Sequence, residues 1–385
     1  MQTPTAIQAD RINQVIHEYD AQGWHRTATP ADQASAHWLA GQVRAAGLDP
    51  QLDPFPIRRL DPLRCFIEID GRRIEGIPQF DAAVTDAGGV RGVIGPAGSD
   101  ATIGLVEAAP NAPRSLDDFD HLRRTKRHTA LIVVTRGRRP GLAVRNAPSF
   151  AEPYGPPVLL VGSEEGGWLA ERAAAGDQAH VVVHAVRTDA TAYNVVAHHL
   201  GTGSDLSPLV VMTPRSGWWQ CASERGGGLA CWLEAMRAIN ERGSARDVIF
   251  VASSGHELGH AGLSAFMDRR PDLGRGAHAW IHFGANIGAA HEGGVRLVAS
   301  DDETAEIALR SLAEADAPAV VRAPRGTVPN GEAHNIHVVG GRYLSLVGSN
   351  AHFHLESDRW PDAVDIAAIA AYARAMSTVA SRLAS

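Results

Sequence analysis

The run Val248-Ile249-Phe250-Val251-Ala252 constrains the fold of this chain more than any other stretch. It is almost entirely β-branched or apolar, which is typical of a central parallel strand buried on both faces. Similar short runs recur along the second part of the chain, at Leu209 to Met212, Trp280 to Phe283 and Tyr343 to Val347. Because helical patterns separate these runs, we predict an α/β fold with a mixed, mainly parallel central sheet flanked by helices.

The composition of the chain changes between about residues 75 and 190. Glycine and proline are more frequent there, and short apolar runs lie between turns. We expect a small β-rich domain at 76–190, inserted into an α/β domain made of 1–75 and 191–385. The basic run at 123–128 is interpreted as a solvated surface. Outside the insertion we expect terminal helices over Ile7 to Tyr19, from Thr29 to Gly47, and from Pro361 to about Ala384.

Charge and cysteine content limit the partners and the compartment. The 36 basic and 43 acidic residues give a net charge of −7, so there is no basic excess for nucleic acid or an anionic membrane. We therefore expect a small-molecule or peptide substrate and no membrane partner; assembly into a homo-oligomer stays open. Three cysteines cannot build a disulfide framework, and no signal peptide or spanning run is evident. These features favour a cytoplasmic protein.

Three segments carry residues of catalytic type: Cys221 to Gly228, His256 to Gly262 and His352 to Pro361. The second contains the letters His-Glu-x-x-His, in which two histidines one helical turn apart hold zinc. That site needs a continuous helix through His256 and His260. Glycines at 255, 259 and 262 disfavour such a helix, so this zincin interpretation is the minor alternative.

Together these segments resemble the zinc aminopeptidase family, which also includes glutamate carboxypeptidase and glutaminyl cyclase. The resemblance covers nearly the whole chain, and residues 95–190 look like the protease-associated domain that is often inserted in those enzymes. It implies an aminopeptidase-like fold and a metal site built from five loops.

By this resemblance, Glu224 stands at the place of a metal-bridging aspartate, Glu257 at that of a glutamate ligand and His354 at that of a histidine ligand. Thr213 and Ala285 stand where the family has the ligands of its other metal. The resemblance therefore implies one zinc ion per chain, held by Glu224, Glu257 and His354. Three protein ligands and an open fourth position suit a catalytic zinc.

His256 replaces the family's glutamate base, and we expect it to act as the general base. A role as fourth ligand and simple packing are the alternatives. Arg215 replaces a carboxylate, and with Arg225 it offers a fork for a substrate carboxylate or phosphate. For each of these two arginines, an ion pair with Glu224 or a nearby aspartate is the alternative.

Other residues are expected around the site. His282, His334 and Trp218 are predicted to contact substrate, with core packing as the alternative for His282 and Trp218. His260 and His352 are predicted to orient the ligands. The resulting hypothesis is an aminopeptidase-type hydrolase that cleaves a peptide, amide or related small carboxylated substrate. A single-metal cyclase, lyase or hydratase and a non-catalytic binding or scaffold protein are the alternatives.

Overall fold

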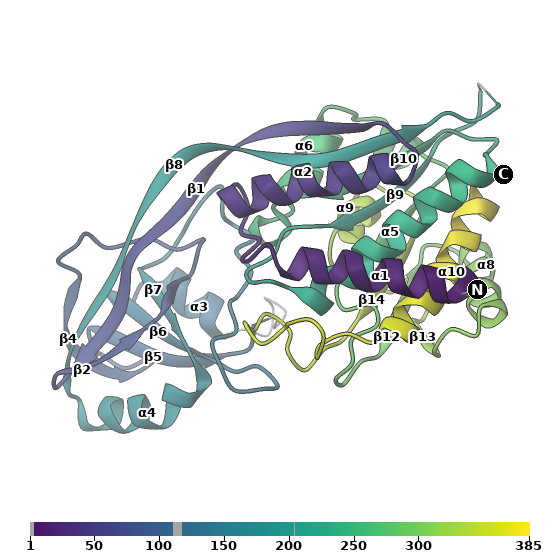
Figure 1. Cartoon of the computed structure of the whole chain (residues 1–385). Coiled ribbons are helices and arrows are strands. Elements are labelled where there is room, and N and C mark those ends of the chain that lie inside the picture. The colour runs from purple at the N-terminus through teal and green to yellow at the C-terminus, as the bar shows by residue number, and fades with distance from the viewer. Residues whose placement is uncertain (1–3, 111–117, 204) are drawn as a thin grey trace.

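Figure 1 shows two lobes joined by two long antiparallel strands, β1 (Pro50–Ile69) and β8 (Gln178–His199). The computed structural model describes residues 4–110, 118–203 and 205–385. The two strands pair from Pro50 opposite Ala197 to Ile69 opposite Ala179, with one register shift near Pro62. β8 is one continuous strand of 22 residues. Because both strands pass through both lobes, the domain boundaries at 75 and 190 stay a prediction.

The central sheet of the main lobe is mixed and mainly parallel, as predicted. Its order is β13-β12-β14-β11-β9-β10-β8, in which β10, β9, β11 and β14 are mutually parallel. The outer strands β12 and β8 pair antiparallel with their neighbours β14 and β10. The bounds are β9 (Leu209–Pro214), β10 (Val248–Ser253), β11 (Ala279–Phe283), β12 (Val295–Ala299), β13 (Val320–Arg322) and β14 (Tyr343–Gly348).

Helices cover both faces of this sheet. Successive residues of β9 point to opposite sides: Val211 joins the larger core beneath one set of helices, whereas Val210 and Met212 join a second core with α6 and α9. The first set is α1 (Pro4–Asp20), α2 (Pro30–Ala45), α5 (Ala222–Arg242), α8 (Asp302–Glu314) and α10 (Ile366–Leu383). The second includes α6 (Ala261–Asp268), α7 (Leu273–Gly276) and α9 (Ala333–Val338).

The helix ends follow local capping. Thr29 caps α2, where its side chain accepts a hydrogen bond from the backbone N–H of Asp32. The last helix begins later than predicted, at Ile366, because Asp365 caps it by accepting from the backbone N–H of Ala368. Residues 361–365 therefore lie outside α10.

Helix α5 lies at the centre of the main lobe, between the sheet and α1 and α10 (Figure 1). Trp232 is fully buried in it, and its Nε1 donates a 3.0 Å hydrogen bond to the carbonyl O of Val211. The helix approaches the loop after β11 so closely that a Cβ on Gly227 would lie 1.9 Å from the carbonyl O of Ile287. Only glycine allows this contact, which positions the first turn of α5.

The small lobe has its own parallel strands and its own apolar core. Its elements are β2 (Arg72–Glu75), β3 (Ile77–Pro78), β4 (Val90–Pro96), β5 (Ile103–Ala108), α3 (Asp118–Thr125), β6 (Ala130–Thr135), β7 (Val158–Val161) and α4 (Gly166–Ala175). The interpretation of 123–128 as solvated is wrong for Arg123 and for His128, which is 2% exposed. Arg123 is 3% exposed, and its Nη2 lies 3.0 Å from Oδ1 of Asp81. Burial of this cation is explained by its carboxylate partner.

The three cysteines, Cys65, Cys221 and Cys231, are buried and unpaired. Within the described ranges, no helix combines the length and the apolar character that a bilayer span requires.

Candidate active site

The carboxyl ends of the parallel strands β9, β10, β11 and β14 meet at one edge of the sheet, where the chemistry of open α/β sheets gathers. Four loops and the first turn of α5 converge there. The two positions expected to have lost metal ligands lie at this edge. Thr213 is buried, and its Oγ1 donates 2.9 Å to the carbonyl O of Phe283. Ala285 lines a cleft described below.

The loop after β10 contains a short 3-10 turn, His256–Leu258, rather than a long helix. Gly255 and Gly259 flank the turn with φ of +80° and +75°, and α6 begins only at Ala261. No continuous helix therefore passes through His256 and His260, and the zincin alternative is wrong. The turn instead points Glu257 inward, where it is 2% exposed.

Arg225 lies between the two predicted carboxylate ligands. Its Nη2 is 2.8 Å from Oε1 of Glu224 and 2.9 Å from Oε1 of Glu257. All three side chains are at most 2% exposed. The ion pair between Arg225 and Glu224, which the sequence left open, is thus present, and it extends to Glu257.

Both oxygens of Glu257 are engaged. Oε1 accepts from Arg225, and Oε2 accepts a 2.9 Å hydrogen bond from Oγ of Ser216. Ser216 in turn accepts 2.8 Å from the backbone N–H of Gly255, and its carbonyl O accepts 2.6 Å from Nε of Arg225. The loops after β9 and β10 and the first turn of α5 are therefore tied together through one guanidinium.

Arg225, Glu224 and Glu257 form a buried charged centre. His354 reaches this centre from the loop after β14. Its Nδ1 donates 2.7 Å to the carbonyl O of Val144, which leaves Nε2 directed toward Glu224, 3.5 Å from Oε1. Among the described residues, Nε2 of His354 and Oε2 of Glu224 have no hydrogen-bond partner, whereas Oε1 of Glu224 is in the ion pair with Arg225. Glu224 and His354 thus each keep one atom without a polar partner, whereas both oxygens of Glu257 already accept a hydrogen bond.

The predicted zinc ligands do not fit a zinc ion in this arrangement. An ion shared by Glu224 and Glu257 would have to displace the guanidinium of Arg225, which contacts both carboxylates. A zinc site needs at least three protein ligands, and only Glu224 and His354 keep unengaged atoms. Across residues 4–110, 118–203 and 205–385, no group of three histidine, cysteine or acidic side chains is arranged to hold a metal.

The electrostatics of the centre agree with its contacts. Burial alone would raise the pKa of Glu224, but the opposing charge of Arg225, helped by His354, lowers it to about 2. Glu224 is therefore ionised, and its charge is balanced by the adjacent guanidinium.

Arg215, expected at the substrate, points away from the cleft. It is 0% exposed, and its Nη1 lies 2.8 Å from Oδ1 of Asp32 at the start of α2. Its Nη2 donates 2.5 Å to the carbonyl O of Tyr193. These contacts correspond to the ion-pair alternative for Arg215, and contact with substrate would require them to open.

A cleft of about 620 Å³ opens beside this centre. Among the residues that line it are imidazole and amide side chains, with two arginines from the small lobe: His256, His260, His282, Asn146, Asn286, Asn330, Asn350, Arg136 and Arg138. Such a volume is that of a small-ligand site, and carboxamides can pair with both groups of a peptide bond.

His256 lies in the cleft wall with a buried carboxylate behind it. Its side chain is 11% exposed, and its Nδ1 lies 3.5 Å from Oε1 of Glu332, which is 0% exposed. Oγ of Ser253 donates 2.5 Å to the same Glu332 oxygen. Burial lowers the pKa of His256 well below its ordinary value, and Arg225 and His260 lower it further. His256 is therefore neutral.

The other two cleft histidines are held by neutral partners. Nδ1 of His282 lies 2.8 Å from Oγ of Ser345, and burial lowers the pKa of His282 to about 3. His260 donates from Nδ1 to Oδ1 of Asn335 at 2.7 Å, and its ring centroid is 4.8 Å from that of His256.

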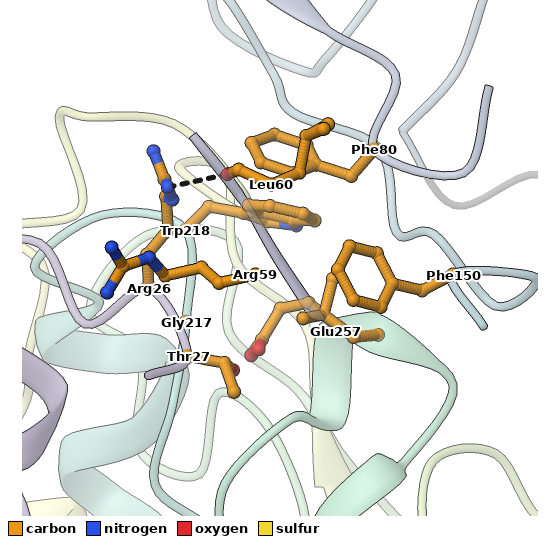
Figure 2. A pocket seen from close by; sticks show the side chains of 10 residues that line it. Arg26, Thr27, Arg59, Leu60, Phe80, Phe150, Gly217, Trp218 and Glu257 are labelled. Atoms are coloured by element: carbon orange, nitrogen blue, oxygen red, sulfur yellow. Dashed lines mark hydrogen bonds between the residues drawn. The ribbon is translucent and has the colours of Figure 1, made fainter. Parts of the chain in front are cut away.

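The remaining predicted residues lie outside the cleft. Trp218 borders a separate cavity of about 10 Å³, room for one water, where Figure 2 shows it beside Phe80 and Phe150 and above Glu257. Its Nε1 donates 3.0 Å to Oδ1 of Asn146. His334 is exposed on α9, and His352 contacts Ser357 at 2.9 Å.

Sequence reasoning missed Glu332 and Ser216. Glu332 sits beside His334, which was considered, but no spacing identifies a single glutamate in a loop as buried behind His256. Ser216 follows Arg215 directly, and only the folded loop shows that its hydroxyl binds Glu257.

No protein-family model and no curated protein matches the chain. Solved structures match it over nearly its whole length. The structure of BSAP, a zinc aminopeptidase from Bacillus subtilis, has a TM-score of 0.79 at 16% identity and covers 96% of this chain and 94% of its own. An aminopeptidase from Aneurinibacillus sp. strain AM-1 has a TM-score of 0.71 at 14% identity, over 96% and 92%. A peptidase M28 precursor from Shewanella amazonensis SB2B has a TM-score of 0.74 at 13% identity, over 99% and 97%.

The chain therefore has the fold of zinc aminopeptidases, and the resemblance stated from the sequence is confirmed for the fold. The identities are low, so the matches establish architecture rather than chemistry. The assignment of 95–190 as a protease-associated domain stays a prediction.

Proposed function

We propose that this protein is a hydrolase that acts on a peptide or related amide bound in the 620 Å³ cleft, with His256 as the general base. The observation that carries the proposal is the pair of His256 and Glu332 in the cleft wall, 3.5 Å apart. The fold shared with structures described as aminopeptidases supports the same class of reaction.

The proposed chemistry uses only residues of this chain. Nδ1 of His256 faces Oε1 of Glu332 at 3.5 Å without a hydrogen bond in this structure. We propose that this bond forms when substrate binds, so that Nε2 is the nitrogen that takes a proton from water. The water oxygen then attacks the substrate carbonyl, and the imidazolium returns the proton to the leaving amine. Asparagine side chains in the cleft, such as Asn286 and Asn350, bind the peptide group. No step is assigned to zinc, because Arg225 takes the position between the two carboxylates.

The test is hydrolysis of a panel of free and N-blocked aminoacyl amides by the wild type and His256→Gln. We expect kcat to fall by about 100-fold or more in the variant, with little change in KM. Glu332→Gln should lower kcat by less, because Glu332 positions the base. His37→Gln, an exposed histidine on α2, is the matched control. Full activity in His256→Gln, or a wild type inactive on the whole panel, contradicts the proposal.

Product masses separate the alternative reactions on the same fold. Hydrolysis gives two products whose masses sum to that of the substrate plus one water. A hydratase gives a single product heavier by one water, and a cyclase or lyase releases a small molecule without a gain of water. Two fragments that together contain one added water, and whose formation depends on His256, support the hydrolase.

A non-catalytic peptide-binding protein is the second candidate, and one observation favours it. The segment 144–147 of the small lobe closes over the site: the backbone N–H of Ala147 donates 2.7 Å to the carbonyl O of Glu257, and Val144 is bonded to His354. Peptide binding that is unchanged in His256→Gln, together with an inactive wild type, favours this candidate.

A further inference from the structure

We propose that the guanidinium of Arg225 is the resident cation of this centre and replaces the metal ion that the three-residue set Glu224, Glu257 and His354 would otherwise share. This inference goes beyond the proposed function, because it concerns what holds the centre together whether or not the protein is a catalyst. It follows from the position of Arg225, its contacts and the number of ligands that remain available around it.

The position of Arg225 is that of a shared cation. Glu224 comes from the first turn of α5 and Glu257 from the loop after β10, 32 residues beyond Arg225 in the chain. A single nitrogen, Nη2, lies within 2.9 Å of an oxygen from each. Two carboxylates brought this close repel each other unless a positive charge lies between them.

The contacts of Arg225 connect loops in the way that a structural metal does. Nε donates 2.6 Å to the carbonyl O of Ser216, from the loop after β9. Nη2 contacts Glu224 and Glu257. One side chain therefore joins the loops after β9 and β10 to the first turn of α5. A guanidinium has a fixed fork of donors and stays protonated, so its charge cannot be removed by a chelator.

The number of available ligands, rather than the net charge, opposes a second cation. Glu224 and Glu257 carry two negative charges, and both are nearly fully buried. Arg225 neutralises one of them, and both oxygens of Glu257 already accept hydrogen bonds. A zinc ion with Arg225 still in place would gain only Glu224 and His354 as ligands, one fewer than a zinc site requires.

The experiment measures zinc content and thermal unfolding, with no assay of activity. Wild type, Arg225→Ala and Arg225→Lys are purified, incubated with excess zinc, dialysed, and analysed by plasma mass spectrometry. We expect less than about 0.1 zinc per chain in the wild type and in Arg225→Lys, and about one in Arg225→Ala. Zinc affinity should rise at least about 100-fold in Arg225→Ala, with a higher Tm in zinc than in EDTA.

Arg123→Ala is the matched control, because it removes a buried arginine from an ion pair with Asp81 in the small lobe. It should lower the Tm without taking up zinc. One zinc per wild-type chain overturns the inference, as does a folded Arg225→Ala that binds none. If Arg225→Ala folds only in zinc, the inference is supported. If Arg225→Ala does not fold at all, the wild type and Arg225→Lys still test the inference. Zinc bound to either of them overturns the inference, and the lack of zinc in both supports it.

Discussion

The side chain of His354 is held by the backbone of Val144: its Nδ1 donates a 2.7 Å hydrogen bond to that carbonyl oxygen. The backbone N–H of Val144 donates back to the carbonyl O of His354 at 3.2 Å. A residue of the main lobe, expected to bind metal, is thus oriented by the small lobe. The same segment reaches Trp218 through Asn146, and this second contact can be tested on its own.

Asn146→Ala removes the acceptor for Nε1 of Trp218, which lies 3.0 Å away. We expect a loss of about 1 kcal/mol in the free energy of unfolding, the usual net value of one hydrogen bond. Trp218→Phe removes the same bond, so a double-mutant cycle in urea should show that the two losses are not additive. Full additivity would mean that the bond contributes nothing.

Gly227→Ala should destabilise the protein by at least about 2 kcal/mol, because overpacking strains a close contact. The added Cβ would lie 1.9 Å from the carbonyl O of Ile287. The matched change is Gly41→Ala within α2, where a Cβ meets nothing within 4 Å. There, better helix propensity should add about 0.5 to 1 kcal/mol. Denaturant midpoints compare the two; equal effects would refute the close approach of α5.

Trp232→Ala should lower the free energy of unfolding by about 3 to 5 kcal/mol, since it leaves a large cavity in the core and removes a hydrogen bond to β9. Leu200→Ala, at a side chain that is 79% exposed, serves as the control and should change stability by less than about 0.5 kcal/mol. Both are measured by chemical unfolding followed by circular dichroism. A small effect of Trp232→Ala would contradict the central position of α5.

Stability should fall in acid partly because of His25. The residue is 0% exposed, its ring stacks on Tyr19 at 3.8 Å, and burial, with Arg215 and Arg225, lowers its pKa from 6.5 to about 3. Between these two values the unfolded chain binds more protons than the folded one, so stability present above pH 6.5 is lost as the pH falls below it. The loss approaches about 1.4 kcal/mol per pH unit.

His25→Phe should reduce this slope, measured as urea stability between about pH 7 and pH 4. His37→Gln, at an exposed position, should leave the slope unchanged. An unchanged slope in His25→Phe would show that His25 is not buried as a neutral ring.

Local patterns were enough to predict the regular part of the main lobe. The apolar run at Val248 predicted β10, and the helical patterns between the apolar runs predicted helices such as α5, because burial on both faces and helical periodicity are encoded within short windows. The ribbon of β1 and β8 was missed. Prolines at 50, 54, 56 and 62 argue against a strand, and they are accommodated because β1 pairs along most of its length with β8 alone.

The site was predicted only as far as the family resemblance extended. Glu224, Glu257 and His354 do approach one another, through Arg225 and a 3.5 Å contact. The direction of the Arg225 side chain decides whether a metal fits among them. No sequence pattern encodes that direction, because a long side chain in a first helical turn can extend to solvent or fold inward. No sequence pattern encodes the direction of the Glu332 side chain either, because His256, which it faces, lies 76 positions earlier in the sequence.

The ribbon of β1 and β8 also limits how this architecture can be rearranged during evolution. Residues of β1 and β8 lie opposite each other along the length of the ribbon, as Pro56 and Thr191 do. A break in one strand would therefore leave backbone groups of the other strand without hydrogen-bond partners. A recombination event that exchanges the small lobe must therefore join β1 and β8 at positions that are paired with each other. An exchange offset by one residue in one strand would turn every following side chain of that strand to the opposite face.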